Sequence, residues 1–266
     1  MRVTALHRFP IKSTAAHVLE RARLDAFGLE HDRRMMLVEP NGRFVTARKH
    51  AELVRCMTTC LDGGWCVEHP THGQLEFSTQ LGTLREVEVW GDHFRARELD
   101  PRAGRWFSEL LGIEVSLVHQ APEGRRHLDP DFVPGEQETV FADGYPLLVA
   151  NEASLRAVNE ALDHPVEMLR FRPNIVVDGE LAWEEDTWLE LEIGDLRFAC
   201  VKPCVRCTMT GIDLSSAERA PEPLRTLARL RRDLSFGVNL VHSGPGEIAV
   251  GARVGVSRHR PPQKLV

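Results

Sequence analysis

Short segments in which apolar and polar residues alternate dominate the first hundred residues of the chain. Alternation with a period of two is typical of a half-buried β-strand, because successive side chains of a strand point to opposite faces. Turn-forming residues such as Pro40, Asn41 and Gly42 separate the segments, as expected for antiparallel strands joined by turns. The strands predicted in this region are 3–6, 34–38, 44–46 and 84–90.

A helix is predicted to interrupt this β-rich region after residue 100. Asp100 is a favourable N-cap, Pro101 suits the first helical position, and Gly112 is a suitable stop. The residues between them place Trp106, Phe107, Leu110 and Leu111 at helical spacing. A further strand is expected to follow the helix at 113–118.

The second half of the chain combines more short strands with two helices. Asn151 is the expected N-cap of a helix that runs through Leu162, and a shorter helix is expected around Leu224, Leu227 and Leu230. The strands predicted here are 145–149, 174–177, 188–192, 196–199, 236–241 and 247–250.

Many short strands, few helices and no regular β-α-β alternation predict a mainly β protein with some α (α+β), built as a β-barrel with helical decoration. Residues 120–137 are rich in proline, glycine and charge, which is typical of a long surface loop and a domain boundary. We therefore divide the chain into an N-terminal β-rich domain at 1–120, a second domain at 121–258 and a tail at 259–266.

Bulk composition narrows the classes of function. The 266 residues include 33 basic and 39 acidic ones, for a formal net charge of −6, which disfavours nucleic acid or a membrane surface as a partner. The N-terminus lacks an apolar segment of signal-peptide length, and no apolar run approaches the ~18 residues of a membrane span. We expect a cytoplasmic protein whose six cysteines are thiols.

Cys200, Cys204 and Cys207 lie in one short segment together with Lys202 and Arg206. Neighbouring cations favour the thiolate and so lower a cysteine's pKa below its ordinary value of about 8.5. A thiolate attacks electrophiles and binds soft metals, which makes Cys207 a candidate nucleophile or ligand. A structural role is the simpler interpretation of the other cysteines, which are Cys56, Cys60, Cys66, Cys200 and Cys204.

The Cys204-x-x-Cys207 spacing is also found in two other kinds of site. A thioredoxin-type dithiol places its first cysteine at a helix N-terminus, but the residues from Thr208 onward favour strand and turn. A structural zinc site would need a fourth ligand beside Cys200, Cys204 and Cys207, and no histidine is nearby in the sequence. Both remain alternatives.

Basic residues recur beside small polar ones at the ends of predicted strands. Each alone is best interpreted as a solvated cation. Together they could converge on one mouth of the barrel and form a local anion pocket on an acidic protein. The positions are Lys12 with Ser13, Arg34, Thr46 with Arg48, Arg172 with Asn174, and Arg206.

Six motifs in one order give a specific resemblance. Over roughly residues 1 to 258, the chain resembles MOSC-domain proteins that carry an N-terminal MOSC-associated β-barrel domain, the kind exemplified by the mitochondrial amidoxime-reducing components and their bacterial relatives. The resemblance implies a MOSC β-barrel with helical decoration plus an N-terminal β-rich domain. The motifs are residues 10–13, 44–48, 171–174, 184–188, 202–207 and 236–239.

The resemblance also implies a cofactor. Proteins of this kind hold one molybdenum through a single pterin dithiolene and one cysteine thiolate, and the matching cysteine is Cys207. Val205 and Asn239 stand where some relatives carry serine and tyrosine. The residues implied to contact the cofactor are Lys12, Ser13, Arg34, Arg48, Arg172, Asn174, Arg206, Thr208 and Asn239.

The implied activity is reduction of N-hydroxylated small molecules, namely hydroxylamines, amidoximes or N-hydroxylated bases. The sequence has no flavin or nicotinamide fingerprint and no ferredoxin-type cysteine spacing. We therefore expect a separate electron-donor protein of the flavin-reductase or ferredoxin type. The alternative functions are a sulfur carrier, with a persulfide on Cys207, and a protein that binds and delivers molybdenum cofactor.

Overall fold

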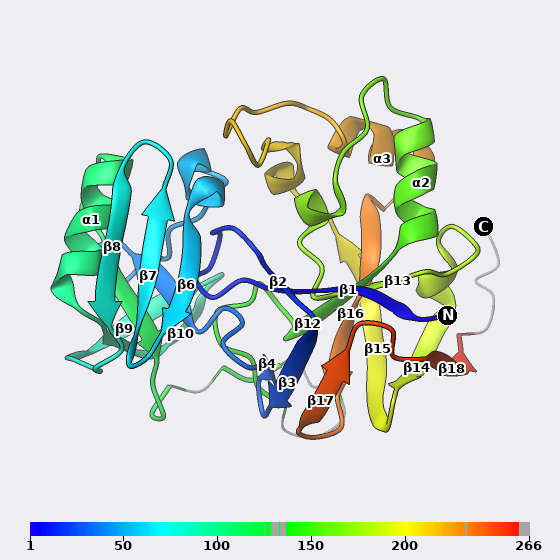
Figure 1. The fold of residues 1–266 in the computed structure, drawn as a ribbon, viewed down its shortest axis with the longest axis horizontal. Coiled ribbons are helices and arrows are strands. Elements are labelled where there is room, and N and C mark those ends of the chain that lie inside the picture. The colour runs from blue at the N-terminus through cyan, green and yellow to red at the C-terminus, as the bar shows by residue number, and fades with distance from the viewer. Residues whose placement is uncertain (125, 129–132, 134–136, 232, 261–266) are drawn as a thin grey trace.

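The computed structural model describes residues 1–260 apart from 125, 129–132, 134–136 and 232. Two β-rich bodies lie side by side in it, the smaller on the left of Figure 1 and the larger on the right. Strands outnumber helices throughout the described part of the chain, which confirms the prediction of a mainly β protein with some α. None of the helices in these residues is both long enough and apolar enough to span a membrane.

The smaller body packs two antiparallel sheets and one helix around a common core. One sheet has the order β5-β11-β10-β9, and the other has the order β6-β7-β8. Trp65, Phe77 and Phe107 are buried between them. The elements are β5 (Met35–Val38), a 3-10 turn (Ala51–Arg55), β6 (Met57–Leu61), β7 (Gly64–His69), β8 (Gly73–Ser78), β9 (Leu84–Val89), β10 (Asp92–Glu98), α1 (Pro101–Leu111) and β11 (Ser116–Gln120).

The larger body is built on an eight-stranded sheet with the order β18-β14-β15-β16-β12-β13-β1-β2, beside a small sheet with the order β17-β3-β4. Trp188, Phe198 and Leu240 are buried in its core. Its strands are β1 (Val3–Arg8), β2 (His17–Leu19), β3 (Arg21–Asp25), β4 (Gly28–Leu29), β12 (Leu147–Asn151), β13 (Ile175–Val177), β14 (Trp188–Ile193), β15 (Leu196–Val205), β16 (Ser235–His242), β17 (Gly246–Ala249) and β18 (Val254–His259).

Helical segments complete the larger body. Helices α2 and α3 lie at the top of Figure 1. Among the described residues, the only parallel pair in the large sheet is β12 with β13, and the connection between these strands contains α2. The helical segments are α2 (Glu152–Glu160), α3 (Leu224–Leu230) and the 3-10 turns η2 (Met168–Phe171), η3 (Glu184–Thr187) and η4 (Thr208–Gly211).

The first strands of the chain belong to the sheets of the larger body. Leu6 of β1 pairs with Ile175 of β13, and Leu24 of β3 pairs with Gly246 of β17. The chain then crosses to the smaller body through β5, so that the segments flanking residues 10 and 33 lie where the two bodies meet. The domain boundary near residue 120 stays a prediction, and much of the loop expected at 120–137 lies outside the described residues.

The predicted helix caps are confirmed. The Asp100 carboxylate accepts a hydrogen bond from the Arg102 amide at 2.9 Å, and Gly112 ends α1 with a φ of 66°. The Asn151 side chain accepts from the Ala153 amide at 3.0 Å, and α2 ends at Glu160, slightly before the expected end. Helix caps can be predicted from a sequence because their hydrogen bonds join residues close together in the chain.

The strand predicted at 44–46 is wrong. Phe44 forms only an isolated bridge with Val38, and the Thr46 carbonyl accepts from the amides of Lys49 and His50, each at 3.0 Å. These bonds close a turn that carries Arg48. The strand expected at 113–118 begins at Ser116 instead, because the Val115 amide donates to the Ser108 hydroxyl at the end of α1.

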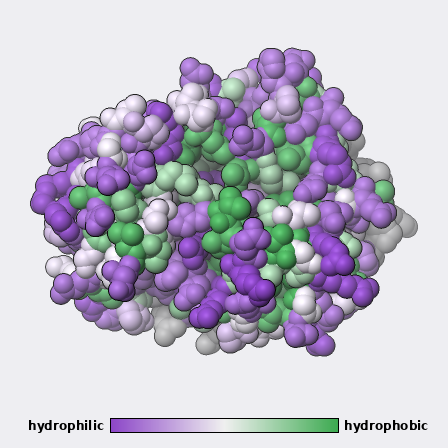
Figure 2. Space-filling view, in the orientation of Figure 1, coloured by the Kyte–Doolittle hydropathy of each residue, from purple (hydrophilic) through white to green (hydrophobic). Residues whose placement is uncertain are grey.

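Polar side chains cover most of the face shown in Figure 2, with apolar residues between them near the middle.

One carboxyl group is fully buried. Glu185, in η3, is 0% exposed and accepts a hydrogen bond from the Ser154 hydroxyl at 2.9 Å. Burial raises the pKa of Glu185 to about 7, although the Ser154 hydrogen bond acts in the opposite direction.

This burial leads to a testable prediction for stability. Because the folded-state pKa of Glu185 lies above the unfolded value of about 4.3, folding favours the protonated form, and the stability contribution is lost as pH rises through 7. Glu185→Gln cannot ionise. We expect its free energy of unfolding, relative to the unchanged protein, to improve by about 1–3 kcal/mol between pH 5 and pH 8. Urea unfolding at both pH values measures this, and a difference that does not vary with pH contradicts it.

Candidate functional site

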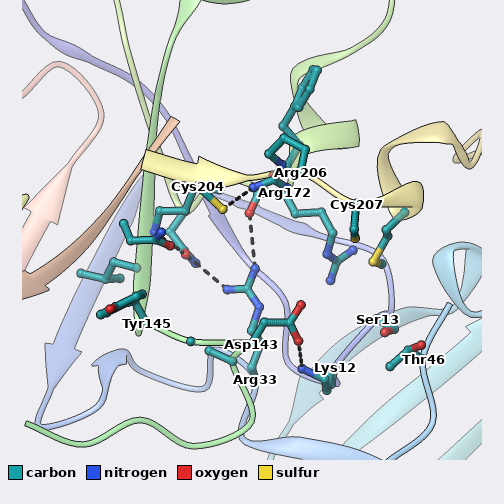
Figure 3. Close-up of a pocket in the computed structure, with 18 of the residues that line it drawn as sticks. Lys12, Ser13, Arg33, Thr46, Asp143, Tyr145, Arg172, Cys204, Arg206 and Cys207 are labelled. Atoms are coloured by element: carbon teal, nitrogen blue, oxygen red, sulfur yellow. Dashed lines mark hydrogen bonds and ion pairs between the residues drawn. The ribbon is translucent and has the colours of Figure 1, made fainter. Parts of the chain in front are cut away.

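A pocket lies where the two bodies meet, and most of the sequence-predicted site residues line it. Figure 3 shows its side chains converging from the segment before β2, the loop before β12, the turn after η2 and the end of β15. Eight of the ten predicted residues are in its wall: Lys12, Ser13, Arg48, Arg172, Asn174, Arg206, Cys207 and Asn239.

Three residues of the pocket wall have a left-handed backbone. Ser13 has a φ of 76°, Arg33 of 48° and Arg172 of 53°. Residues other than glycine rarely adopt this conformation, because the Cβ atom approaches the carbonyl oxygen. Such conformations persist only where the surrounding structure enforces them, and they cluster at functional sites. Their gathering here marks the pocket as the candidate functional site.

Lys12, which is buried, forms an ion pair at one side of the pocket with Asp143, whose side chain is 60% exposed. The Lys12 ammonium is 2.5 Å from Asp143 Oδ1 and also donates to the Phe141 carbonyl at 2.6 Å. Burial alone would raise the pKa of Asp143, but the Lys12 charge holds it well below its usual range. Burial lowers the pKa of Lys12 despite the Asp143 charge. Asp143 is therefore an anion that fixes Lys12 and is not a proton donor near neutral pH.

Arg33 and Asn174 hold the turn that carries Arg172. Arg33 donates to Asp32 at 2.5 Å, to Asn174 Oδ1 at 3.2 Å and to the Arg172 carbonyl at 3.3 Å. The side-chain amide of Asn174 in turn donates from Nδ2 to the His7 carbonyl at 3.1 Å. Asn174 therefore lines the pocket while its side chain also ties β1 to the Arg172 turn.

One N–H group of Arg172 in the pocket wall lacks a hydrogen-bond partner among the described residues. Its Nη1 donates to the Thr14 carbonyl at 2.8 Å and its guanidinium lies 4.0 Å from the centroid of the Phe9 ring, but its buried Nη2 has no partner among the described residues. Desolvation, followed by the charge of Arg33, lowers the pKa of Arg172 to about 9. A cation in this situation favours an anionic ligand. Figure 3 shows the Arg172 side chain extending toward Cys207.

Arg206 contacts Cys204, although Cys207 is its direct neighbour in the sequence. Its Nη1 donates to Cys204 Sγ at 2.7 Å and its Nη2 donates to the Phe171 carbonyl at 2.7 Å, while its buried Nε has no partner in the described structure. The ammonium of Lys202 lies 5.4 Å from the centroid of the Tyr145 ring. Arg206 and Lys202 were both expected beside Cys207. Arg206 instead contacts Cys204 and the Phe171 carbonyl, and Lys202 lies near Tyr145.

Cys207 joins the end of β15 to η4 and is half-buried in the pocket wall. Its carbonyl accepts from the amide and the hydroxyl of Thr210, at 3.1 and 3.0 Å. These bonds close the 3-10 turn η4, so the expectation of strand and turn residues after Thr208 missed a helical turn. Cys204, the first cysteine of the pair, lies inside β15 and so does not begin a helix.

Two predicted residues do not line the pocket. Arg34 is buried against Asp25 and Gln120, at 2.5 and 2.9 Å, and Thr208 is exposed on η4. Arg33 lies in the pocket where Arg34 was expected. Sequence reasoning also missed Asp143, Tyr145 and the pocket position of Cys204. The sequence alone does not show which of two adjacent arginines faces a pocket, because it does not reveal that Arg33 has a left-handed backbone.

The described residues contain no group of three or more His, Cys, Asp or Glu side chains that could hold a metal ion. The zinc site weighed for Cys200, Cys204 and Cys207 therefore has no ligand cluster in this part of the chain. Cys200 is buried, and burial raises the pKa of its thiol to about 12, which makes it unreactive.

Comparison with known proteins assigns both halves of the chain to a family. Residues 1–114 match the family model described as the MOSC N-terminal beta barrel domain, and residues 136–255 match the model of the MOSC domain. The fold and the pocket thus define a two-domain MOSC protein. More narrowly, the chain belongs to the MOSC family that includes the mitochondrial amidoxime reducing components and the molybdenum cofactor sulfurases.

Relatives of both kinds are about equally similar. The chain is 31% identical to mitochondrial amidoxime reducing component 2 of Bos taurus, over 86% of this chain and 72% of that protein. It is 31% identical to component 1 of Mus musculus, over 94% of this chain and 80% of that protein. Identity to molybdenum cofactor sulfurase 1 of Aedes aegypti is 33%, over 92% of this chain but only 34% of that protein. The chain therefore spans about a third of the sulfurase.

The Nη2 group of Arg172, which has no partner among the described residues, leads to a testable prediction. Inorganic phosphate should stabilise the cofactor-free protein, and each kcal/mol of binding raises Tm by about 2–4 °C for a chain of this size. Arg172→Gln should lose at least half of this gain. Arg156→Gln, which removes an exposed arginine of α2, is the matched control and should keep it. Thermal unfolding with and without phosphate tests this, and equal gains in the two variants would contradict the assignment.

Proposed function

We propose that the pocket binds a molybdenum cofactor with a single pterin, that Cys207 is the protein ligand of the metal, and that the protein reduces N-hydroxylated small molecules. The observation that carries the proposal is the composition of the wall. It combines a soft thiol donor with five cationic side chains but only one carboxylate: the cations are Lys12, Arg33, Arg48, Arg172 and Arg206, and the carboxylate is Asp143.

The pocket fits an anionic, sulfur-containing group. Buried Arg172 Nη2 and Arg206 Nε have no partners among the described residues, so each could donate to a phosphate or a pterin acceptor. A thiolate is the ligand type that suits a metal already bound by sulfur, and Cys207 would be that ligand. The family supports the same conclusion, because its members are named for molybdenum cofactor or for amidoxime reduction.

The residues of the chain would have separate roles. Cys207 would bind the metal, while Arg172 and Arg206 would neutralise the anionic part of the cofactor. When bound, the cofactor supplies a metal centre that takes oxygen from the substrate's N–O bond and is restored by two electrons and two protons, with release of water. Asp143 is ionised beside Lys12, so it would orient Lys12 without supplying those protons.

The electrons would come from a separate donor protein of the flavin-reductase or ferredoxin type. None of the three cysteines in the pocket segment belongs to a cluster that could hold an iron–sulfur centre within the described residues. Reconstitution with a chemical donor such as reduced viologen therefore tests the chemistry without requiring the partner to be identified.

The sulfurase relatives favour a second candidate function, in which Cys207 carries a persulfide or the protein binds and delivers cofactor. Metal analysis of protein purified without oxygen separates these possibilities. Stoichiometric molybdenum with pterin favours a reductase or a carrier, and reduction of an amidoxime then distinguishes the two. Labile sulfane sulfur without metal favours the persulfide.

A pair of variants tests the assignment of the ligand. Cys207→Ser is nearly isosteric but removes the soft donor, so we expect a folded protein whose amidoxime reduction falls by more than the roughly 10–100-fold typical of losing an outer-shell partner. Cys204→Ser is the matched control. Serine can still accept the Arg206 hydrogen bond, and activity should fall far less. Normal molybdenum-dependent turnover by Cys207→Ser would show that the ligand is misassigned.

A further inference from the structure

Trp90 occupies an unusual position at the tip of the β9–β10 hairpin. Val89 pairs with Asp92, which leaves Trp90 and Gly91 as a two-residue turn, with φ angles of 55° and 90°. Positive φ at both positions is the signature of a type I′ turn, in which Asn-Gly and Asp-Gly are favoured. A bulky aromatic residue at the first of these positions opposes the local preference, so its presence calls for an explanation beyond the turn.

Trp90 contacts two residues of the pocket wall, Asp143 and Arg48. Its indole N–H donates to Asp143 Oδ1 at 3.1 Å, and the Arg48 guanidinium lies 4.1 Å from the ring centroid. Phe44 packs against the ring edge, with centroids 5.2 Å apart. Asp143 and Arg48 both line the pocket. The hairpin therefore holds the indole in a fixed orientation at the border of the site.

Much of this indole remains open to solvent. Trp90 is 52% exposed, whereas Trp65, Trp106 and Trp188 are 8% exposed or less and Trp183 is half-buried. A rigidly held aromatic ring with an open surface can bind a planar ligand group at low entropic cost. The unpaired donors of Arg172 and Arg206 would engage the cofactor, so the outer rim is left for the end of a substrate that extends out of the pocket.

We propose that Trp90 recognises the substrate: its open indole surface stacks on the planar ring of an aromatic N-hydroxylated compound whose N–O group enters the pocket. This inference rests on the proposed function for the identity of the substrate. It assigns to the N-terminal domain a part in substrate selection, and it predicts that aromatic amidoximes are preferred over aliphatic ones.

The hairpin offers a variant that should not unfold. Trp90→Asn introduces the residue that a type I′ turn favours, which offsets the lost contacts with Asp143, Arg48 and Phe44, so the variant should stay folded. Trp90→Phe keeps a ring but removes the N–H that reaches Asp143. Benzamidoxime and acetamidoxime form a matched pair of probes, because they share the amidoxime group and differ in having a phenyl ring or a methyl group.

The kinetic test compares the two probes with a chemical electron donor. In Trp90→Asn, the ratio of kcat/KM for benzamidoxime to that for acetamidoxime should fall about fivefold, mainly through KM, which corresponds to about 1 kcal/mol of stacking. Trp90→Phe should keep most of the ratio, and molybdenum content should be unaltered in both variants. An unchanged ratio in Trp90→Asn overturns the proposal, as does an equal loss for both probes, which would mean that Trp90 acts through Asp143 and Arg48.

A binding measurement separates this inference from the proposed function. Because Trp90 is the most exposed of the tryptophans, benzamidoxime should quench the intrinsic fluorescence saturably in the unchanged protein and in neither Trp90→Asn nor an acetamidoxime titration. If the unchanged protein reduces neither amidoxime, the proposed function fails, and the titration alone decides on stacking. Absence of saturable quenching, or the same quenching in Trp90→Asn, overturns it.

Discussion

The constraint on which the site depends is electrostatic: cations drawn from distant parts of the chain are crowded into one pocket with too few anions to neutralise them. Lys12 is paired with Asp143, and Arg33 is paired with Asp32. Arg172 has no carboxylate partner among the described residues and has a lowered pKa. Such an arrangement is costly in a protein without a ligand and becomes favourable when an anion enters. The pocket is therefore built for a negatively charged group.

The fold explains how these cations are brought together. Because β1 pairs with β13, the segment after β1 lies next to the turn of Arg172, whose Nη1 donates to the Thr14 carbonyl. The chain then enters the smaller body, which contributes Arg48 and the contacts of Trp90. Both bodies thus contribute to one pocket. The pocket can therefore form only when both bodies are folded and in contact.

The sequence predicted the class of fold, the helix caps of α1 and α2 and eight of the residues that line the pocket. The caps could be predicted because their hydrogen bonds join residues close together in the chain. The pocket wall came from resemblance, since periodicity carries no information on which strand ends meet. The confusion of Arg34 with Arg33 and the omission of Trp90 have one physical cause. Both Arg33 and Trp90 adopt a left-handed backbone against local preference, imposed by contacts with distant residues.

Binding of the metal by Cys207 is tested most directly by X-ray absorption at the molybdenum edge, made on protein purified without oxygen and on Cys207→Ser loaded with the same cofactor. We expect one protein sulfur bound to molybdenum in addition to the dithiolene sulfurs, and the loss of that sulfur in the variant. The same number of molybdenum–sulfur bonds in both proteins, or no molybdenum in the unchanged protein, would contradict it.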